Sequence, residues 1–136
     1  MNVVIKLGFC FVPGNIIKPK EARYAPFVNF SDAANDDDAL YTLVLSNPDG
    51  HFTEENCEYL HWMVANVGGS EDKNVNVVSA GGGAETVCRY LPPFPPFGTG
   101  YHRLVFVLYK QVSRLRQSNR AYPTSTCSSF SVRTDG

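Results

Sequence analysis

Three stretches of the chain gather apolar residues in the way that β-strands do. "ALYTLVLS" covers Ala39–Ser46, "EYLHWMVANV" covers Glu58–Val67, and "RLVFVLYKQ" covers Arg103–Gln111. All three are rich in β-branched and aromatic residues, and the first is followed by the turn sequence "NPDG". We therefore predict three strands that belong to one sheet system.

The Glu58–Val67 strand is apolar at both of its alternating sets of positions. A strand with one wet face would alternate apolar and polar residues, whereas polar residues are few here. The pattern predicts a strand that is covered on both faces, and Arg103–Gln111 leads to the same prediction. The two sets are Tyr59, His61, Met63, Ala65 and Val67, and then Leu60, Trp62, Val64 and Asn66.

The segments between these strands are rich in turn residues and carry no convincing amphipathic helix. Val3–Leu7 is β-rich, residues 13–30 are predicted to be extended chain with turns, and Ser31–Asp38 is predicted to be an acidic loop. The stretch 68–86, "GGSEDKNVNVVSAGGGAET", is predicted to be a long flexible connection. Short strands separated by Pro, Gly and Asn turns favour an all-β sandwich or barrel.

The composition changes after Gln111. Residues 112–136 are rich in Ser, Thr and Arg, and their hydrophobic periodicity fades. Such side chains cannot offset the entropy of ordering, so we predict one β domain at residues 1–111 and a disordered tail at residues 112–136.

The chain has 136 residues and a net charge of -1, which fits a single domain without a global basic field for nucleic acid. No apolar run approaches 18 residues, so no membrane span is predicted. The short apolar run near the N-terminus lacks the features of a signal or transit peptide, so if the protein works in mitochondria its address is expected to lie outside this chain. The cysteines are widely spaced and contain no Cys-x-x-Cys pair, which favours reduced thiols in an intracellular protein. They are Cys10, Cys57, Cys88 and Cys127.

All three histidines, His51, His61 and His102, lie near strand or turn boundaries, and Asp49 lies in the "NPDG" turn. Imidazoles with a carboxylate suit metal binding, acid–base catalysis or the binding of an anion by N–H donors. Zinc is disfavoured because Cys57 and His61, four residues apart on a strand, would stand roughly 13 Å apart. Hydrolysis lacks a nucleophile motif such as Gly-x-Ser-x-Gly. An anion pocket makes the fewest demands, and purely structural roles for these residues remain equally open.

Three longer segments together resemble the phosphatidylethanolamine-binding protein family. "YTLVLSNPDGHF" (Tyr41–Phe52) is similar to the family's first motif, in which a strand runs into an Asp-Pro-Asp-x-Pro turn. "EYLHWMVANVGG" (Glu58–Gly69) is similar to the next core strand with its histidine, and "YLPPFPPFGTGYHRLVFVLYKQ" (Tyr90–Gln111) to the Pro-rich loop with Gly-x-His-Arg. The resemblance spans about residues 12–111. It implies a large antiparallel sheet packed on a smaller one, with an anion pocket near one end.

The resemblance also implies which residues line that pocket. Asp49 matches the second acid of the first motif, Asn47 stands where the first acid is usual, and His61 and His102 match the two pocket histidines. A proline-stiffened loop would hold His102 against Asp49 and His61 at a small ordering cost. The expected ligand set is Asn47, Asp49, His61, Pro92 and His102.

Several positions depart from the family pattern and weaken the implied pocket. Asn47 replaces a carboxylate, His51 stands where proline is usual, Leu60 where many members carry a further histidine, and Leu104 where tyrosine is typical. The family's C-terminal part ends in a helix that helps to close the pocket and has no counterpart in residues 112–136. We therefore expect a β-sandwich truncated at its C-terminus, with a vestigial anion pocket.

Within the family, the three motifs are most similar to a branch found in the large subunit of the mitochondrial ribosome. This resemblance implies a non-catalytic structural domain in the mitochondrion, without cofactor or metal. Its expected partners are ribosomal proteins of that subunit, with rRNA as a further candidate. The alternative is a free-standing module, in the cytoplasm, that binds phosphate-bearing or phospholipid headgroups or regulates signalling proteins.

Overall fold

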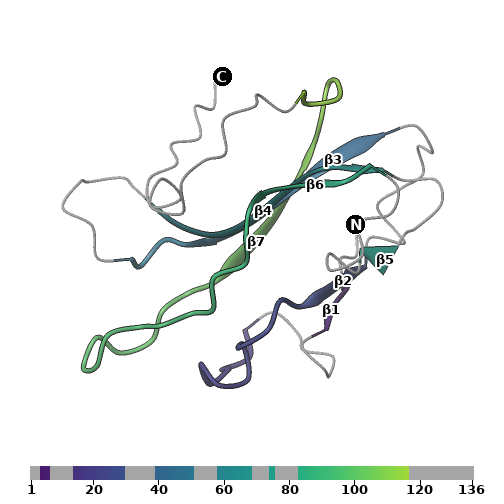
Figure 1. The fold of residues 1–136 in the computed structure, drawn as a ribbon. Coiled ribbons are helices and arrows are strands. Elements are labelled where there is room, and N and C mark those ends of the chain that lie inside the picture. The colour runs from purple at the N-terminus through teal and green to yellow at the C-terminus, as the bar shows by residue number, and fades with distance from the viewer. Residues whose placement is uncertain are drawn as a thin grey trace.

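Two antiparallel sheets organise the chain (Figure 1). The computed structural model describes residues 4–6, 14–29, 39–50, 58–68, 74–75 and 83–116. The larger sheet has the strand order β6-β4-β3-β7 and the smaller sheet the order β1-β2-β5. The prediction of an all-β fold with a large and a small antiparallel sheet is confirmed. The strands are β1 (Val4–Lys6), β2 (Phe27–Asn29), β3 (Leu40–Asn47), β4 (Tyr59–Gly68), β5 (Asn74–Val75), β6 (Glu85–Cys88) and β7 (Val105–Lys110).

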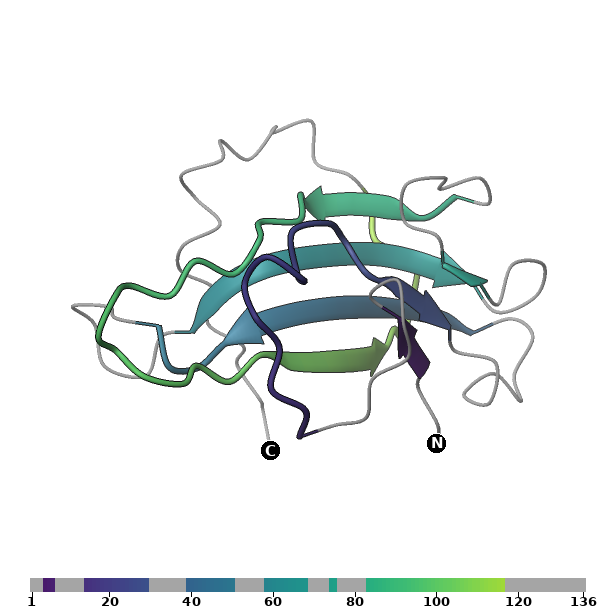
Figure 2. The same ribbon diagram turned by 90° about the horizontal axis from the view of Figure 1, so that it is seen from below.

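The main hydrophobic core lies between the two sheets. Residues 14–29 pass across one face of the larger sheet (Figure 2), and Val28 of β2 is fully buried against it. Leu43 and Leu45 of β3 and Trp62 of β4 are buried in the same cluster. Burying side chains of this size contributes about 1.5–3 kcal/mol each, so these central strands set the fold.

Strand β4 carries two β-bulges, and they change which face its residues occupy. Leu45 and Ser46 of β3 pair with Trp62 and Leu60, so His61 is an extra residue between two paired positions. As a result Leu60 packs in the second core cluster, on Val44 and Cys88, while Trp62 packs in the first. Strict alternation along this strand, as the sequence suggested, is therefore wrong, although burial on both faces is confirmed.

The second bulge lies near the other end of β4. Tyr41 and Leu43 of β3 pair with Val67 and Val64, which leaves one extra residue on β4 between those pairs. Asn66 takes up the irregularity with a φ of 56° in the left-handed region, which asparagine adopts more readily than most residues. Its side chain is almost completely buried.

Strand β7 is shorter and less covered than the sequence suggested. It pairs with β3 and forms an edge of the larger sheet within the described residues. Phe106 and Leu108 pack against the core, but Val105 and Tyr109 on the other face are 38% and 40% exposed. The prediction that this strand is covered on both faces is wrong, because the face that carries Val105 and Tyr109 stays accessible among the described residues.

The stretch 68–86, expected to be a flexible connection, contains β5 and the start of β6. β6 pairs with β4 and ends at Cys88, which is buried as a thiol with its Sγ 3.6 Å from the Arg89 carbonyl oxygen. The other three cysteines and His51 lie outside the described residues. Across the described ranges, no helix is long and apolar enough to cross a membrane.

The chain that leaves β7 is anchored to the sheet as far as it is described. Gln111 donates from its backbone to Leu40, and its side chain bonds Asn66 and Thr42. Leu115 exchanges two hydrogen bonds with the Asn66 amide, and Arg114 donates to the Gly83 carbonyl. Residues 112–116 therefore contact the β domain, while the rest of the predicted tail lies outside the described residues.

Candidate functional site

The candidate site lies where β3 ends and the Pro-rich loop arrives. The "NPDG" sequence closes a turn in which the Gly50 N–H donates to the Asn47 carbonyl over 3.3 Å. The Asp49 N–H also donates to the Asn47 side-chain oxygen Oδ1 over 2.9 Å, which is the local bond that favours asparagine at such turns. This bond fixes the orientation of the Asn47 amide, so its Nδ2 group points the other way.

His102 is oriented by a chain of hydrogen bonds. Asn47 Nδ2 lies 3.3 Å from His102 Nδ1, so Asn47 donates and Nδ1 accepts. His102 Nε2 lies 2.7 Å from Thr99 Oγ1, and Thr99 Oγ1 donates to the Pro96 carbonyl over 2.8 Å. The Thr99 hydroxyl proton is thus directed to Pro96, and His102 Nε2–H donates to Thr99. The tautomer of His102 follows from the fixed amide of Asn47.

The loop reaches this position through a tight turn. The Thr99 N–H donates to the Pro96 carbonyl over 3.3 Å, and Gly98 inside the turn has a φ of 83°. A residue with a side chain would be strained there, and the preceding prolines restrict the loop further. The turn therefore places Thr99 and His102 on the same side, facing the end of β3.

Asp49 is committed to Arg103. Its carboxylate accepts the Arg103 backbone N–H at 2.7 Å, and the guanidinium donates from Nη2 at 2.6 Å and from Nε at 2.9 Å. The pair is exposed on the arginine side, where the side chain is 73% accessible. The Arg103 side-chain and backbone hydrogen bonds lower the pKa of Asp49 to about 2. The pKa of Arg103 is raised for the same reason. This ion pair locks the end of the loop onto the turn.

His61 projects from the bulge on β4. Its Nδ1 donates to the Leu91 carbonyl over 2.8 Å, and the Leu91 N–H donates to the His61 carbonyl over 2.8 Å. Burial lowers the pKa of His61, and the Leu91 hydrogen bond opposes part of that shift. The rings of Tyr59 and Phe94 pack on the imidazole, with centroids 4.8 and 6.1 Å away. Because Nδ1 is engaged by Leu91, Nε2 is the nitrogen left for another partner, on a side chain that is only 2% exposed.

The structure brings most of the expected ligand set to one end of the sheet. Asn47, Asp49 and His102 form one hydrogen-bonded cluster. The ring of Tyr59 packs on His61, and Tyr59 pairs with Asn47 across β4 and β3. His61 therefore lies beside this cluster. Their role in binding a ligand stays a prediction. Pro92 is exposed on the loop. It lies between Leu91, whose carbonyl accepts a hydrogen bond from His61, and Phe94, whose ring packs on the His61 imidazole.

Sequence reasoning overlooked three residues that shape this site. Arg103 was assigned to a strand, yet it holds Asp49. Thr99 and Pro96 were treated as generic loop, yet they fix the imidazole of His102. The spacing Pro96-x-Gly98-Thr99 is typical of a tight turn with glycine at its third position, so this signal was available in the sequence.

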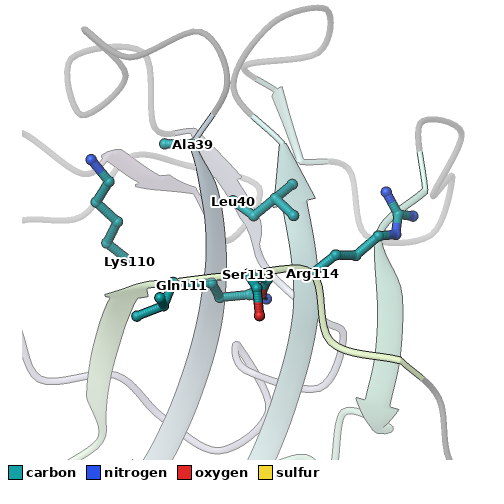
Figure 3. Close-up of a pocket in the computed structure, with 7 residues that line it drawn as sticks. Ala39, Leu40, Lys110, Gln111, Ser113 and Arg114 are labelled. Atoms are coloured by element: carbon teal, nitrogen blue, oxygen red, sulfur yellow. Dashed lines mark hydrogen bonds between the residues drawn. The ribbon is translucent and has the colours of Figure 1, made fainter.

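A different hollow lies at the opposite end of β3 and β7 (Figure 3). Leu40 and Asn47 lie seven positions apart along β3, or about 23 Å at the usual strand rise, so the hollow is distinct from the histidine site. The side chains of Lys110 and Arg114 extend away from each other on its two sides (Figure 3). The lining residues are Ala39, Leu40, Lys110, Gln111, Val112, Ser113 and Arg114.

Comparisons with known proteins agree with this architecture. Residues 9–134 match the family described as "Phosphatidylethanolamine-binding protein". A protein of Oryza sativa subsp. japonica named "Protein MOTHER of FT and TFL1 homolog 2" is 38% identical over 103 residues, which make up 74% of this chain and 52% of that protein. The chain thus spans about half the length of this curated relative. The expected family is confirmed, and neither comparison points to the mitochondrial ribosomal branch.

Proposed function

Because the chain belongs to the phosphatidylethanolamine-binding protein family, we propose that it is a non-catalytic binding module for a phosphate-bearing group. The phosphate would sit at the end of β3, against Asn47, His61 and His102. The observation that carries the proposal is the hydrogen-bonded chain from Asp49 through Asn47 and His102 to Thr99. It fixes polar groups before any ligand arrives, which lowers the cost of ordering on binding.

The charges near the site favour a weakly bound anion. Asp49 is neutralised by Arg103, so its carboxylate adds little repulsion. Asn47 Nδ2 has a second hydrogen beyond the one directed at His102, and His61 gains an Nε2–H donor when it is protonated. Protonation of His61 is opposed by burial, so the anion and a proton should bind together. Phosphate binding is therefore expected to strengthen as the pH falls from 8 to 6.

The hydrogen-bond directions argue against nucleophilic catalysis. His102 Nε2–H donates to Thr99, and the Thr99 hydroxyl proton is directed to the Pro96 carbonyl. His102 in this tautomer cannot take the Thr99 proton, so the pair is not a nucleophile with its base. Asp49 is bound to Arg103 and does not orient an imidazole. The arrangement suits binding and does not suit hydrolysis.

Calorimetry with inorganic phosphate and phosphoethanolamine tests the proposal. We expect dissociation constants of about 1 mM, with tighter binding at pH 6 than at pH 8. His61→Ala removes a hydrogen bond to a charged ligand, which should weaken binding about tenfold or more and remove most of the pH dependence. Arg114→Ala, which removes a cation at the far end of the sheet, is the matched control and should change nothing.

Two results would contradict this function. One is the absence of binding heat at 50 mM ligand, and the other is an equal loss of affinity in the His61 and Arg114 variants. A phosphoserine peptide, titrated beside phosphoethanolamine, separates the two sources of the phosphate group. Preference for the peptide would favour a regulator of phosphorylated signalling proteins, and preference for phosphoethanolamine would favour a lipid headgroup. No observation favours the structural role in the mitochondrial ribosome, which stays a prediction.

A further inference from the structure

The Pro-rich loop has a second feature next to the phosphate site, which it borders through the contacts of Leu91 and Phe94 with His61. Between Arg89 and Pro96 the sequence is "RYLPPFPP", with four prolines in five consecutive positions. Proline fixes its own φ and disfavours helical geometry in the residue before it, so the segment is biased toward extended, polyproline II geometry at Leu91, Pro92, Phe94 and Pro95, each of which precedes a proline. No cis peptide bond is found in the described chain, and no regular strand is assigned to this segment.

A polyproline II helix has three residues per turn, so residues three apart share an edge. One edge faces the protein. Tyr90 donates from its hydroxyl to the Ala22 carbonyl over 2.6 Å, and its ring packs edge-on against Trp62 at 5.7 Å. Burial also raises the pKa of Tyr90 to about 12. Pro93, one turn later, is half-buried. The body of the domain therefore holds the segment by this edge.

The other two edges are more accessible, although Phe94 also packs edge-on against the rings of Tyr59 and His61. Arg89 and Pro92 are exposed, and Pro95 on the same edge is partly exposed. On the next edge Leu91 is partly exposed and Phe94 is 63% exposed. Arg89 makes no salt bridge within the described part of the chain. The segment thus presents the basic residue Arg89 together with two apolar-proline pairs, Leu91-Pro92 and Phe94-Pro95.

We propose that Arg89–Pro95 is a docking site for a protein domain of the SH3 type. Such domains hold polyproline II segments in aromatic-lined grooves, in which each apolar-proline pair fills one groove. A neighbouring acidic pocket takes a basic residue three positions before the first proline of the P-x-x-P core. Arg89, Pro92 and Pro95 have the spacing Arg-x-x-Pro-x-x-Pro, and Leu91 and Phe94 stand directly before the two prolines.

The fold prepares this segment for docking. The backbone of Leu91 is tied to His61 by two hydrogen bonds, and Tyr90 is anchored on the core. A free peptide must lose backbone freedom when it binds, whereas this segment has lost much of it already. The intact chain should therefore bind an SH3 domain at least as tightly as a synthetic peptide of residues 88–97. The charge of Arg89 should supply selectivity through the acidic pocket.

The test is a binding assay of the full chain against a panel of purified SH3 domains that accept Arg-x-x-Pro-x-x-Pro peptides, with WW and EVH1 domains beside them. We expect saturable binding to members of the SH3 set. Arg89→Glu should weaken that binding more than about tenfold, because a charge-assisted contact becomes repulsive. Arg23→Glu, which reverses an exposed arginine outside the motif, is the matched control and should leave the affinity unchanged.

Fluorescence of the single buried Trp62 shows whether each variant is folded. Pro92→Ala offers a second folded variant in which the groove contact is lost without a change of charge. Binding to no SH3 domain, a preference for WW or EVH1 domains, or equal effects of Arg89→Glu and Arg23→Glu would each overturn the proposal. Phosphate binding by the Arg89 variant should be unchanged, so a failure here leaves the proposed phosphate site to its own test.

Discussion

Asn66 is the residue whose replacement should be most costly to the fold. It is 2% exposed, and its amide makes three good hydrogen bonds. It donates to the Leu115 carbonyl at 2.9 Å and accepts from the Leu115 N–H at 2.8 Å and from Gln111 Nε2 at 3.2 Å. These bonds anchor the chain that leaves β7 onto β4. We therefore predict that Asn66→Ala both destabilises the domain and releases residues 112–116.

The expected cost follows from these contacts. Three net hydrogen bonds at about 0.5–1.5 kcal/mol each sum to about 1.5–4.5 kcal/mol. Alanine at the left-handed φ of 56° adds about 1–2 kcal/mol, a strain that asparagine bears more easily. Asn66→Ala should thus lower the free energy of unfolding by about 2.5–6.5 kcal/mol. Asn66→Gly loses the same bonds without that strain and should cost about 1–2 kcal/mol less.

Urea unfolding followed by Trp62 fluorescence measures both variants, because Trp62 is the single tryptophan and is buried. Trypsin offers a local readout at Arg114 and Arg116, which should be cut faster in the Ala variant under native conditions. Gln117→Ala, just beyond the described segment, serves as the control. A loss below about 1 kcal/mol for Asn66→Ala, or equal losses for Ala and Gly, would contradict this prediction.

Two further predictions concern pH. The folded pKa of His61 is lowered, so the unfolded state binds more protons between that value and the ordinary 6.5. The free energy of unfolding should rise with pH across this window, by at most about 1.4 kcal/mol per pH unit, and His61→Gln should remove this rise. If urea unfolding gives the same free energy at every pH from 5 to 8, this prediction is wrong. The folded pKa of Asp49 is lowered to about 2, so its pairing with Arg103 stabilises the fold above the ordinary value of 3.8 and is lost as the pH falls toward 2. A carboxyl NMR titration should give a midpoint of about 2 that moves toward 3.8 in Arg103→Gln, and a wild-type midpoint near 3.8 would exclude the pair.

The sequence predicted the sheet well because its central strands are long and apolar. β3 and β4 are each shifted by one residue from the predicted ranges and β7 lies inside its range, since hydrophobic patterning is strongest where a strand is buried. β5 and β6 were missed because they lie in a Gly- and Asn-rich stretch, where composition indicates a loop. Their pairing with β2 and β4 is a tertiary contact that local propensity does not report.

The bulges on β4 could not be predicted from periodicity. Alternation assumes one residue per paired position, and an extra residue at His61 changes the face of every residue that follows. The bulge also explains how His61 reaches the loop at Leu91. The site residues on the loop and on β3 are about 55 positions apart in the sequence, and only the resemblance to a family joined them. The pairing of Asp49 with Arg103 depends on how the loop returns to the end of β3, which the sequence pattern does not predict.

The most direct test of the account is an NMR map of phosphoethanolamine binding on the full chain. At pH 6, we expect the largest amide and imidazole shifts on Asn47, His61 and His102. These shifts should saturate with a dissociation constant of about 1 mM, and His61→Ala should remove them. Shifts that gather instead around Lys110 and Arg114, or none at all at 50 mM ligand, would contradict the claim that the end of β3 is a phosphate-binding site.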